Sequence, residues 1–136
     1  MSEFLFVYGT LRPGYPNYGR VAPYVRRSFA ATAEGLQLLR ASSVGFPFAV
    51  ARAGARATGT LLELTSQVGA ALESCDRLEG YNVALDAGLY LRRITTVTSA
   101  ETGAVDAWFY LAGVNTAGLL EVPGNDWAQL VPRLGA

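Results

Sequence analysis

Apolar residues along this chain fall into short runs that predict β-strands separated by turns. The runs are rich in valine, leucine, phenylalanine and tyrosine, and glycine or proline lies between most of them, a pattern typical of strands joined by turns. The predicted strands cover residues 3–7, 28–39, 46–50, 57–64, 89–98 and 105–111. The pattern therefore indicates a β-dominated chain.

Further details of the strands follow from their apolar content and their glycines. The run at 3–7 is short and apolar, and we expect it to be a buried, central strand. The second strand is expected to bend near Gly35, and the third and fourth to form a neighbouring pair around Gly54. Gly59, inside the fourth run, predicts a bulge or a close approach of backbones. The last two runs predict a hairpin with its turn at 101–103.

One segment predicts a clear α-helix. Thr65 or Ser66 is a suitable N-cap, the helix is expected to run to about Leu78, and Gly80 occupies the position where a left-handed residue commonly ends a helix. Asp76 lies near the edge of the polar face and is expected to be an ordinary solvated residue. No second segment of the chain predicts a helix of similar clarity.

The tail and the overall size complete the predicted architecture. Asn125 or Asp126 is expected to cap a final helical turn through about Val131. The length and the apolar share allow one core and not two, so residues 1–136 are predicted to form a single domain. We predict an α+β fold: a small, barrel-like mixed sheet of about six strands with one main helix.

Glu79 differs from the other acidic residues of the predicted helix because the helical period places it on the apolar stripe. Val68, Leu72 and Cys75 are spaced by four and three positions and form one core-facing stripe. At about 100° per residue, Glu79 projects between Val68 and Leu72, so its carboxyl is expected to point inward. Burial and the negative end of the helix dipole both predict a raised pKa. Glu79 is then a candidate general acid/base, unless it lies past the helix end and reaches solvent or pairs with an arginine.

The composition excludes most other catalytic chemistry. The chain has no histidine, its eleven basic residues are all arginine, and Cys75 is its single cysteine. These absences remove Ser-His-Asp and Cys-His nucleophile systems, Schiff-base lysines, histidine or thiolate zinc sites and intramolecular disulfides. If the protein is an enzyme, carboxylates must carry its proton transfers, and no metal site is expected.

The charge and the hydropathy of the chain restrict its expected binding partners and its expected cellular location. The formal net charge is zero and the arginines are scattered, so no nucleic-acid or membrane-binding surface is expected. The sequence contains neither a long apolar span nor a recognisable signal peptide, which predicts a cytoplasmic protein. The expected partners are small molecules or a second copy of the chain in a homodimer.

The loop after the first strand is a second candidate site. Tyr8-Gly9-Thr10-Leu11-Arg12 contains a glycine that lets the backbone approach a ligand and exposes successive N–H groups, which can hold a carboxylate or oxyanion. For the loop taken by itself, a plain transition from strand to turn is the simpler explanation of the same residues. The loop is not a phosphate loop, because it lacks the required glycine spacing and lysine.

Taken together, several motifs resemble the gamma-glutamylcyclotransferase-like superfamily, in particular its small bacterial and gamma-glutamylamine cyclotransferase-type members. The combination of Tyr-Gly-Thr-Leu with a later Asp-x-x-Glu-Gly-Tyr is more specific than either motif alone. The motifs are Val7-Tyr8-Gly9-Thr10-Leu11-Arg12, Pro47 with its apolar neighbours, Gly59-Thr60-Leu61-Leu62-Glu63-Leu64, Asp76-Arg77-Leu78-Glu79-Gly80-Tyr81, Tyr90-Leu91-Arg92, Ala107-Trp108-Phe109-Tyr110 and Gly124-Asn125-Asp126-Trp127. Two departures are Phe46, where many relatives have tyrosine, and an inserted Asn125.

The resemblance implies an enzyme that cyclises a gamma-glutamyl group to 5-oxoproline and releases an amine or amino acid. Glu79 would be the base and then the acid, and the backbone N–H groups of Gly9, Thr10 and Leu11 would bind the substrate carboxylate or the oxyanion. The implied reaction requires no cofactor. Three side chains have two interpretations each. Tyr8 and Tyr110 are either polar walls of the substrate site or core aromatics. Arg92 either acts in the site, by orienting Glu79 or contacting a carboxylate, or forms a structural ion pair.

Two other functional classes remain open at this level. A catalytically silent member of the fold would bind a small molecule without turnover, and a structural interaction module would use no cavity chemistry at all. The module would leave Glu79 exposed with an ordinary pKa, whereas retention of Glu79 argues against the silent member. Fold-level analogy alone does not separate these classes.

Overall fold

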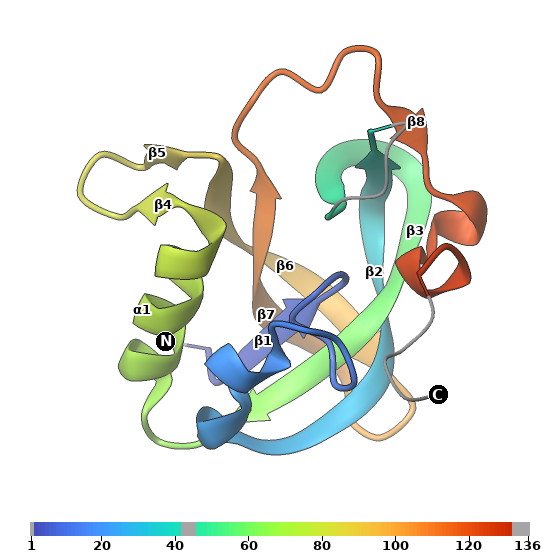
Figure 1. Cartoon of the computed structure of the whole chain (residues 1–136). Coiled ribbons are helices and arrows are strands. Elements are labelled where there is room, and N and C mark those ends of the chain that lie inside the picture. The colour runs from blue at the N-terminus through green and yellow to red at the C-terminus, as the bar shows by residue number, and fades with distance from the viewer. Residues whose placement is uncertain (1, 42–45, 132–136) are drawn as a thin grey trace.

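A six-stranded sheet that closes on itself forms the body of the protein (Figure 1). The computed structural model describes residues 2–41 and 46–131. The sheet order is β3-β1-β7-β6-β2-β8, and an additional pairing of β3 with β2 closes the barrel. The strands are β1 (Phe4–Val7), β2 (Val25–Arg40), β3 (Phe48–Leu64), β6 (Tyr90–Ser99), β7 (Gly103–Ala112) and β8 (Leu120–Glu121). The predicted barrel-like α+β class is confirmed.

β1 is a central strand, as its apolar run predicts. It pairs antiparallel with β3 and parallel with β7, where Leu5 faces Trp108, and all other strand pairs in the barrel are antiparallel. Its side chains alternate, so that Phe6 joins the core inside the barrel while Leu5 and Val7 join the core beneath the helix. The run is apolar throughout because both of its faces are buried.

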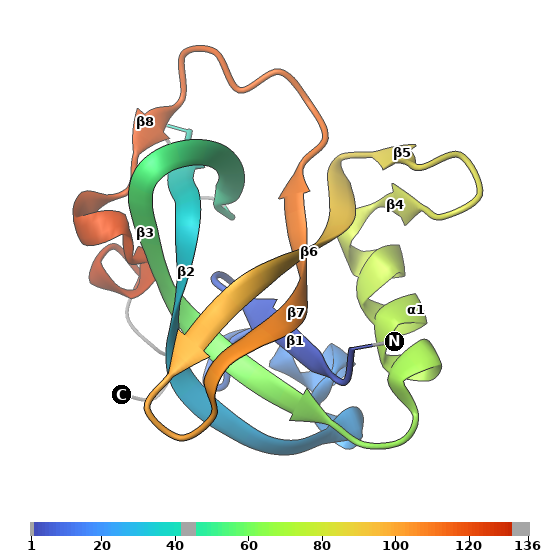
Figure 2. The ribbon, with the colours of Figure 1, turned by 180° about the vertical axis from the view of Figure 1, so that it is seen from behind.

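The two apolar runs at 46–50 and 57–64 belong to one strand, β3, and not to a pair around Gly54. Both halves of β3 pair with β2: Ala51 lies opposite Leu36, and Arg56 lies opposite Glu34. The residues between them, including Gly54 at φ +83°, form a bulge opposite the bend of β2, and β3 curls there instead of reversing (Figure 2). The predicted pair of strands is therefore wrong, because the positive φ of Gly54 serves a bulge within a continuous ladder.

The predicted features at the other glycines are confirmed. Gly35 adopts φ +78° at the register shift that bends β2. At Gly59, a Cβ would lie 2.5 Å from the carbonyl oxygen of Val7 and 2.7 Å from the ring of Phe6. A glycine is required there because the end of β1, which pairs alongside β3, leaves no space for a side chain at this position.

The main helix, α1 (Val68–Glu79), packs against the outside of the barrel. It ends at Gly80, which has the predicted left-handed conformation. Its start differs from the prediction: the N-cap is Gln67, without a side-chain cap, and Thr65 instead accepts a hydrogen bond from the N–H of Gln67. A two-stranded hairpin, β4 (Tyr81–Asn82) with β5 (Ala87–Gly88), follows the helix directly.

Short 3-10 helices flank the barrel, namely η1 (Tyr18–Arg20), η2 (Ala22–Tyr24), η3 (Pro123–Asn125) and η4 (Trp127–Gln129). Asp126 caps η4 by accepting from the N–H of Ala128, so one of the two predicted caps is confirmed. Trp127 is buried against the ring of Tyr15, with centroids 5.2 Å apart. The tail is thereby fixed to the loop that follows β1.

Asn125 holds the tail against the bend of β2. Its Oδ1 accepts from the N–H of Leu38 at 2.7 Å, and its Nδ2 donates to the carbonyls of Leu36 and Arg56 at 2.8 Å each. The residue has φ +53°, a left-handed conformation that asparagine tolerates better than most residues. None of the helices among residues 2–41 and 46–131 is long and apolar enough to cross a membrane.

Candidate active site

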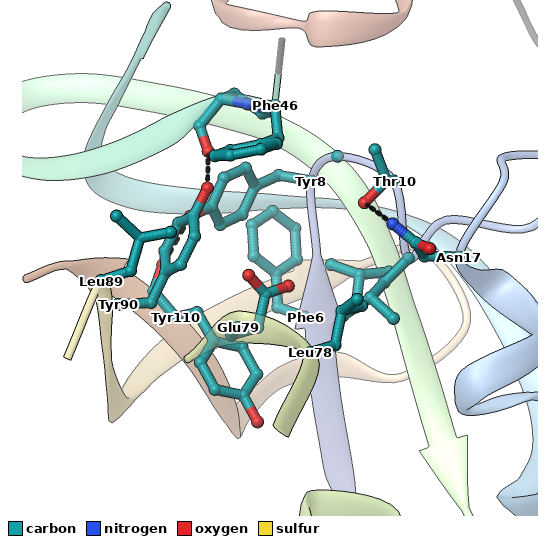
Figure 3. Close-up of a pocket in the computed structure, with 14 residues that line it drawn as sticks. Phe6, Tyr8, Thr10, Asn17, Phe46, Leu78, Glu79, Leu89, Tyr90 and Tyr110 are labelled. Carbon is teal, nitrogen blue, oxygen red and sulfur yellow. Dashed lines mark hydrogen bonds between the residues drawn. The ribbon is translucent and has the colours of Figure 1, made fainter. Parts of the chain in front are cut away.

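A cavity of about 130 Å³ opens at one end of the barrel. Its walls come from five segments distant in sequence: β1 with the loop after it, the segment before β3, the last turn of α1, the start of β6, and β7 (Figure 3). The lining residues are Phe6, Val7, Tyr8, Gly9, Thr10, Leu11, Asn17, Phe46, Pro47, Leu78, Glu79, Leu89, Tyr90 and Tyr110. Most of this lining is apolar or aromatic, which strengthens any electrostatic interaction within it.

Glu79 is the last residue of α1 and points its carboxyl group into this cavity (Figure 3). Burial raises its pKa from the ordinary 4.5 to about 7, because the surrounding walls stabilise the neutral form. Within the described part of the chain, no side chain or backbone N–H forms a hydrogen bond or ion pair with it. The inward orientation predicted from helical periodicity is thus the one that the structure has, and the carboxyl is available to a ligand.

Asp76, one turn earlier, is buried and not solvated as the sequence pattern suggests. Its Oδ1 accepts from the hydroxyl of Tyr110 at 2.7 Å, and its Oδ2 receives a bond from Nη1 of Arg92 at 2.6 Å. The expectation was wrong because these two partners come from β7 and β6, which helical periodicity alone does not reveal. Asp76 fastens the helix that carries Glu79 to the barrel wall.

Arg92 is therefore a structural ion-pair residue, the second of its two predicted roles. It does not line the cavity, and its guanidinium packs over the rings of Tyr81 and Trp108, at 5.6 and 5.1 Å from their centroids. The substrate-binding role expected for Arg92 has no geometric support. No cluster of three or more His, Cys, Asp or Glu side chains suited to a metal occurs among the described residues.

The loop after β1 presents its backbone to the cavity. Gly9, Thr10 and Leu11 all line it, and in the described ranges their N–H groups donate to no protein acceptor. The turn is held by other bonds: the N–H of Arg12 donates to the carbonyl of Gly9, and the backbone and side chain of Asn17 both donate to Thr10. The result is a short row of free donors in a fixed conformation, suited to an anion.

Gly9 is also required for space. A Cβ at this position would lie 2.9 Å from the ring of Pro47. This contact brings the two segments together at the cavity wall, so the glycine serves a close approach between loop and ring.

The tyrosine hydroxyls on the cavity wall are bonded to the protein. Tyr8 donates to the carbonyl of Tyr110 at 2.6 Å, and Tyr90 donates to the carbonyl of Pro47 at 2.7 Å. The hydroxyl of Tyr110 donates to Asp76 and points away from the carboxyl of Glu79 (Figure 3). Tyr8 and Tyr110 therefore contribute aromatic faces to the cavity, and burial raises the pKa of each well above its ordinary value.

Several lining residues were not among the predicted site residues. They include Asn17, Phe46, Leu78, Leu89 and Tyr90. Tyr90 and the neighbours of Pro47 fall within motifs that carry the family resemblance, and these motifs were the sequence feature that could have indicated their place in the site. Leu78 left no local signal, because its place at the cavity depends on how the loop, the helix end and β6 meet.

The arrangement is suited to proton transfer on an anionic substrate. One carboxyl group with a pKa near neutrality can accept and return a proton at physiological pH. The loop residues Gly9, Thr10 and Leu11, whose N–H groups donate to no described acceptor, line the same cavity, and such groups can hold a carboxylate or a developing oxyanion.

The same fold and motifs occur in known proteins. The profile of the gamma-glutamyl cyclotransferase, AIG2-like family matches residues 5–129. A search of curated proteins finds no significant match. Among solved structures, an AIG2-like protein of Mus musculus superposes with a TM-score of 0.72 at 20% identity, covering 98% of this chain and 95% of the mouse chain.

Two further structures extend this likeness. An uncharacterised protein of Pyrococcus horikoshii is 21% identical with a TM-score of 0.58, and the match covers 95% of this chain and 92% of the archaeal one. A protein named gamma-glutamyl cyclotransferase is 17% identical with a TM-score of 0.61, covering 89% of this chain and 70% of that protein. At these identities the structures establish the fold, and the profile establishes the family. The chain belongs to the gamma-glutamyl cyclotransferase, AIG2-like family.

Proposed function

We propose that this protein is a cofactor-independent gamma-glutamyl cyclotransferase. It would convert a gamma-glutamyl amide to 5-oxoproline and release the amine or amino acid. The observation that carries the proposal is the Glu79 carboxyl, with a pKa of about 7, in a cavity that is also lined by Gly9, Thr10 and Leu11, whose backbone N–H groups donate to no described acceptor. Family membership supplies the reaction class.

Substrate binding is assigned to the loop after β1. The N–H groups of Gly9, Thr10 and Leu11 bind the α-carboxylate of the glutamyl group, or the oxyanion that forms on the γ-carbonyl oxygen. The rings of Tyr8 and Tyr110 confine the glutamyl chain in a folded conformer. Folding brings the α-nitrogen to its own γ-carbonyl, so the reaction is intramolecular and gains from positioning.

Glu79 carries both proton transfers. Its carboxylate takes a proton from the α-ammonium, and the resulting amine forms a bond to the γ-carbonyl carbon. The bond from that carbon to the leaving nitrogen then breaks, and the carboxylic acid returns the proton to this nitrogen. The ring nitrogen loses its second proton as the lactam forms, and the departing amine takes this proton and leaves as an ammonium ion. The products are 5-oxoproline and the protonated amine, and Glu79 is restored to its initial state.

The first test measures 5-oxoproline released by the purified protein from a panel of gamma-glutamyl amines and gamma-glutamyl amino acids. Glu79→Gln is expected to lower kcat by roughly 10²- to 10⁴-fold, since the amide accepts no proton. Glu73→Gln is a matched control on the exposed face of the same helix, where Glu73 pairs with Arg77, and it should keep full activity. Full activity of Glu79→Gln would refute the mechanism, and a panel with no turnover would favour a silent binding domain.

The pH profile is a second test of the same carboxyl. Because Glu79 must begin as the carboxylate, kcat/KM should rise with pH up to about 7 and level off above it. A group with the ordinary carboxyl pKa of 4.5 would already be ionised throughout the neutral range. A flat profile between pH 5 and 8 would therefore exclude Glu79 as the base.

A further inference from the structure

The loop after β1 has a fixed internal shape. The N–H of Arg12 donates to the carbonyl of Gly9 at 3.1 Å, and the N–H of Asn17 donates to the carbonyl of Thr10 at 3.0 Å. The side chain of Asn17 adds a bond to the Thr10 hydroxyl at 2.9 Å (Figure 3). These bonds join residues of the loop to one another, so they set its shape but not its place relative to the rest of the cavity.

The side chain of Arg12 anchors the loop to two other elements. Its Nε donates to the hydroxyl of Thr60 on β3, and its Nη1 donates to Oδ1 of Asp126 in the tail, each at 3.2 Å. The side chains of Arg12 and Asp126 are only 15% and 22% exposed, so this ion pair is largely shielded from water and salt. Arg12 directly follows the row of free N–H groups at 9–11, and its tail contact therefore bears on the position of that row.

The side chain of Tyr15 forms a second link between the loop and the tail. Its ring packs on the ring of Trp127, with both rings buried, and its hydroxyl donates to the carbonyl of Val131 at 2.7 Å. One contact is apolar and the other is a hydrogen bond, and both lie on the same tail segment as Asp126. The loop and the tail are thus joined at two points.

The tail residues act on the site only through the loop. Arg12, Asp126 and Trp127 do not line the cavity, whereas residues 9–11 do. Asp126 and Trp127 belong to a motif of the sequence, Gly124-Asn125-Asp126-Trp127, whose last two residues have no part in the proposed chemistry. Their contacts with Arg12 and Tyr15 give them a use.

We propose that Asp126, supported by Trp127, is a positioning residue that holds residues 9–11 where their N–H groups can bind the substrate. The inference rests on the role proposed above for these N–H groups. Fixed donors stabilise a carboxylate or an oxyanion without reorganisation only when their surroundings keep them in place. A small displacement of such groups lowers the rate of the reaction.

The test replaces Asp126 by residues that keep its cap but change its contact with Arg12. Asp126→Ser retains an oxygen that can accept from the N–H of Ala128, but its side chain is too short to reach Arg12. The kcat/KM for release of 5-oxoproline should fall by about tenfold. Asp126→Asn keeps an acceptor of the original length and should retain more of the activity.

The pH profile separates this role from an effect on the proton carrier. In Asp126→Ser, kcat/KM should still level off near pH 7, because the burial that sets the pKa of Glu79 is unchanged. A plateau shifted to another pH would contradict the inference, since the variant would then act through Glu79.

A matched control separates it from a loss of stability. Glu63→Gln breaks the ion pair that Glu63 on β3 forms with Arg27 on β2 at 2.7 Å, and neither residue lines the cavity. This variant should keep the kcat/KM of the wild type. Circular dichroism and urea unfolding give the folded fraction of each variant, so that rates are compared per folded molecule.

A double variant tests whether Asp126 acts through Arg12. In an Arg12→Met background, Asp126→Ser should lower kcat/KM by less than about twofold, because the contact that it removes is already absent. Full activity of Asp126→Ser, or losses that multiply in the double variant, would overturn the inference and leave the cyclotransferase function intact. Failure of the wild type to release 5-oxoproline from any gamma-glutamyl compound of the panel would overturn both.

Discussion

The carboxyl of Glu79 is more easily ionised in the unfolded chain than in the folded protein. Its pKa is about 7 in the cavity and about 4.5 as an ordinary glutamate. Below pH 4.5 the Glu79 carboxyl is protonated in both the folded and the unfolded state, so its ionisation does not change the free energy of unfolding. As the pH rises from 4.5 to 7, the unfolded chain releases the proton first, so the ionised group increasingly lowers the stability of the fold.

Replacing Glu79 by glutamine should therefore stabilise the protein at alkaline pH. The free energy of unfolding of Glu79→Gln is expected to exceed that of the wild type at pH 8, by at most about 3 kcal/mol, because the carboxyl is partly reached by solvent. The advantage should shrink as the pH falls and vanish near pH 4.5. Urea unfolding at both pH values measures it, and an equal difference at the two pH values would contradict a raised pKa.

At the residue scale, the sequence reveals a side chain's direction more readily than its partners. Helical periodicity was enough to direct Glu79 inward, because the helix fixes the direction of each side chain relative to Leu72 and Cys75. The same periodicity predicted a solvated Asp76, which is wrong because its hydrogen-bond partners Tyr110 and Arg92 come from strands distant in sequence. The free N–H groups of the loop had a simpler alternative explanation until the fold placed them on the cavity.

At the scale of elements, Asn125 supports the bend shared by β2 and β3. The register shift at Gly35 interrupts the ladder between β2 and β3. Close to this shift, the Asn125 side chain bonds to backbone groups of Leu36, Leu38 and Arg56. This residue of the tail therefore links both strands at their shared bend.

Removing this side chain should destabilise the fold in two separable steps. Asn125→Gly tolerates the left-handed backbone but loses the bonds, and the free energy of unfolding should fall by about 1–3 kcal/mol. Asn125→Ala should lose about 1 kcal/mol more, because its Cβ is strained at φ +53°. Asn115→Gly, which removes one exposed bond to the N–H of Ala117, should cost under about 1 kcal/mol. Denaturant unfolding compares the three, and equal losses for Asn115→Gly and Asn125→Gly would refute this role.

The sequence predicts whether a segment is a strand or a helix where a local pattern determines this. It does not predict the boundaries of an element where tertiary contacts determine them. The apolar run of β1 and the left-handed Gly80 carried local signals that were sufficient. The continuity of β3 through Gly54 depends on β2 lying opposite both halves, and nothing within the strand's own sequence indicates this. The helix start at Val68 likewise differs from the residues with the best capping propensity.

At the scale of the whole molecule, Asp76 joins three elements. It lies on α1 and bonds to β6 through Arg92 and to β7 through Tyr110, and the side chains of Asp76 and Arg92 are only 11% and 15% exposed. The interaction therefore fixes the helix on the barrel at the turn that carries Glu79. The barrel and the helix would otherwise meet through apolar contacts, which are less directional.

Breaking this junction should affect stability strongly. Asp76→Ala leaves the Arg92 guanidinium buried without its partner, and the free energy of unfolding should fall by roughly 3–5 kcal/mol. Glu73→Ala breaks the exposed pair with Arg77 on the same helix and should change stability by under about 1 kcal/mol. Thermal and urea unfolding of the two variants provide the comparison. Similar losses would show that the Asp76 junction contributes no more than a surface ion pair.

The central position of β1 has a consequence for how the chain folds. β1 precedes both of its partners in the chain, and its parallel partner β7 contains Trp108, which faces Leu5. During synthesis, both faces and both edges of β1 therefore remain unpaired until β3 and then β7 have emerged from the ribosome. Contacts between residues so far apart in sequence slow folding. A nascent chain that ends before β7 exposes an apolar strand with an unpaired edge, which promotes aggregation. Chaperone dependence should therefore be greatest just before β7 is complete.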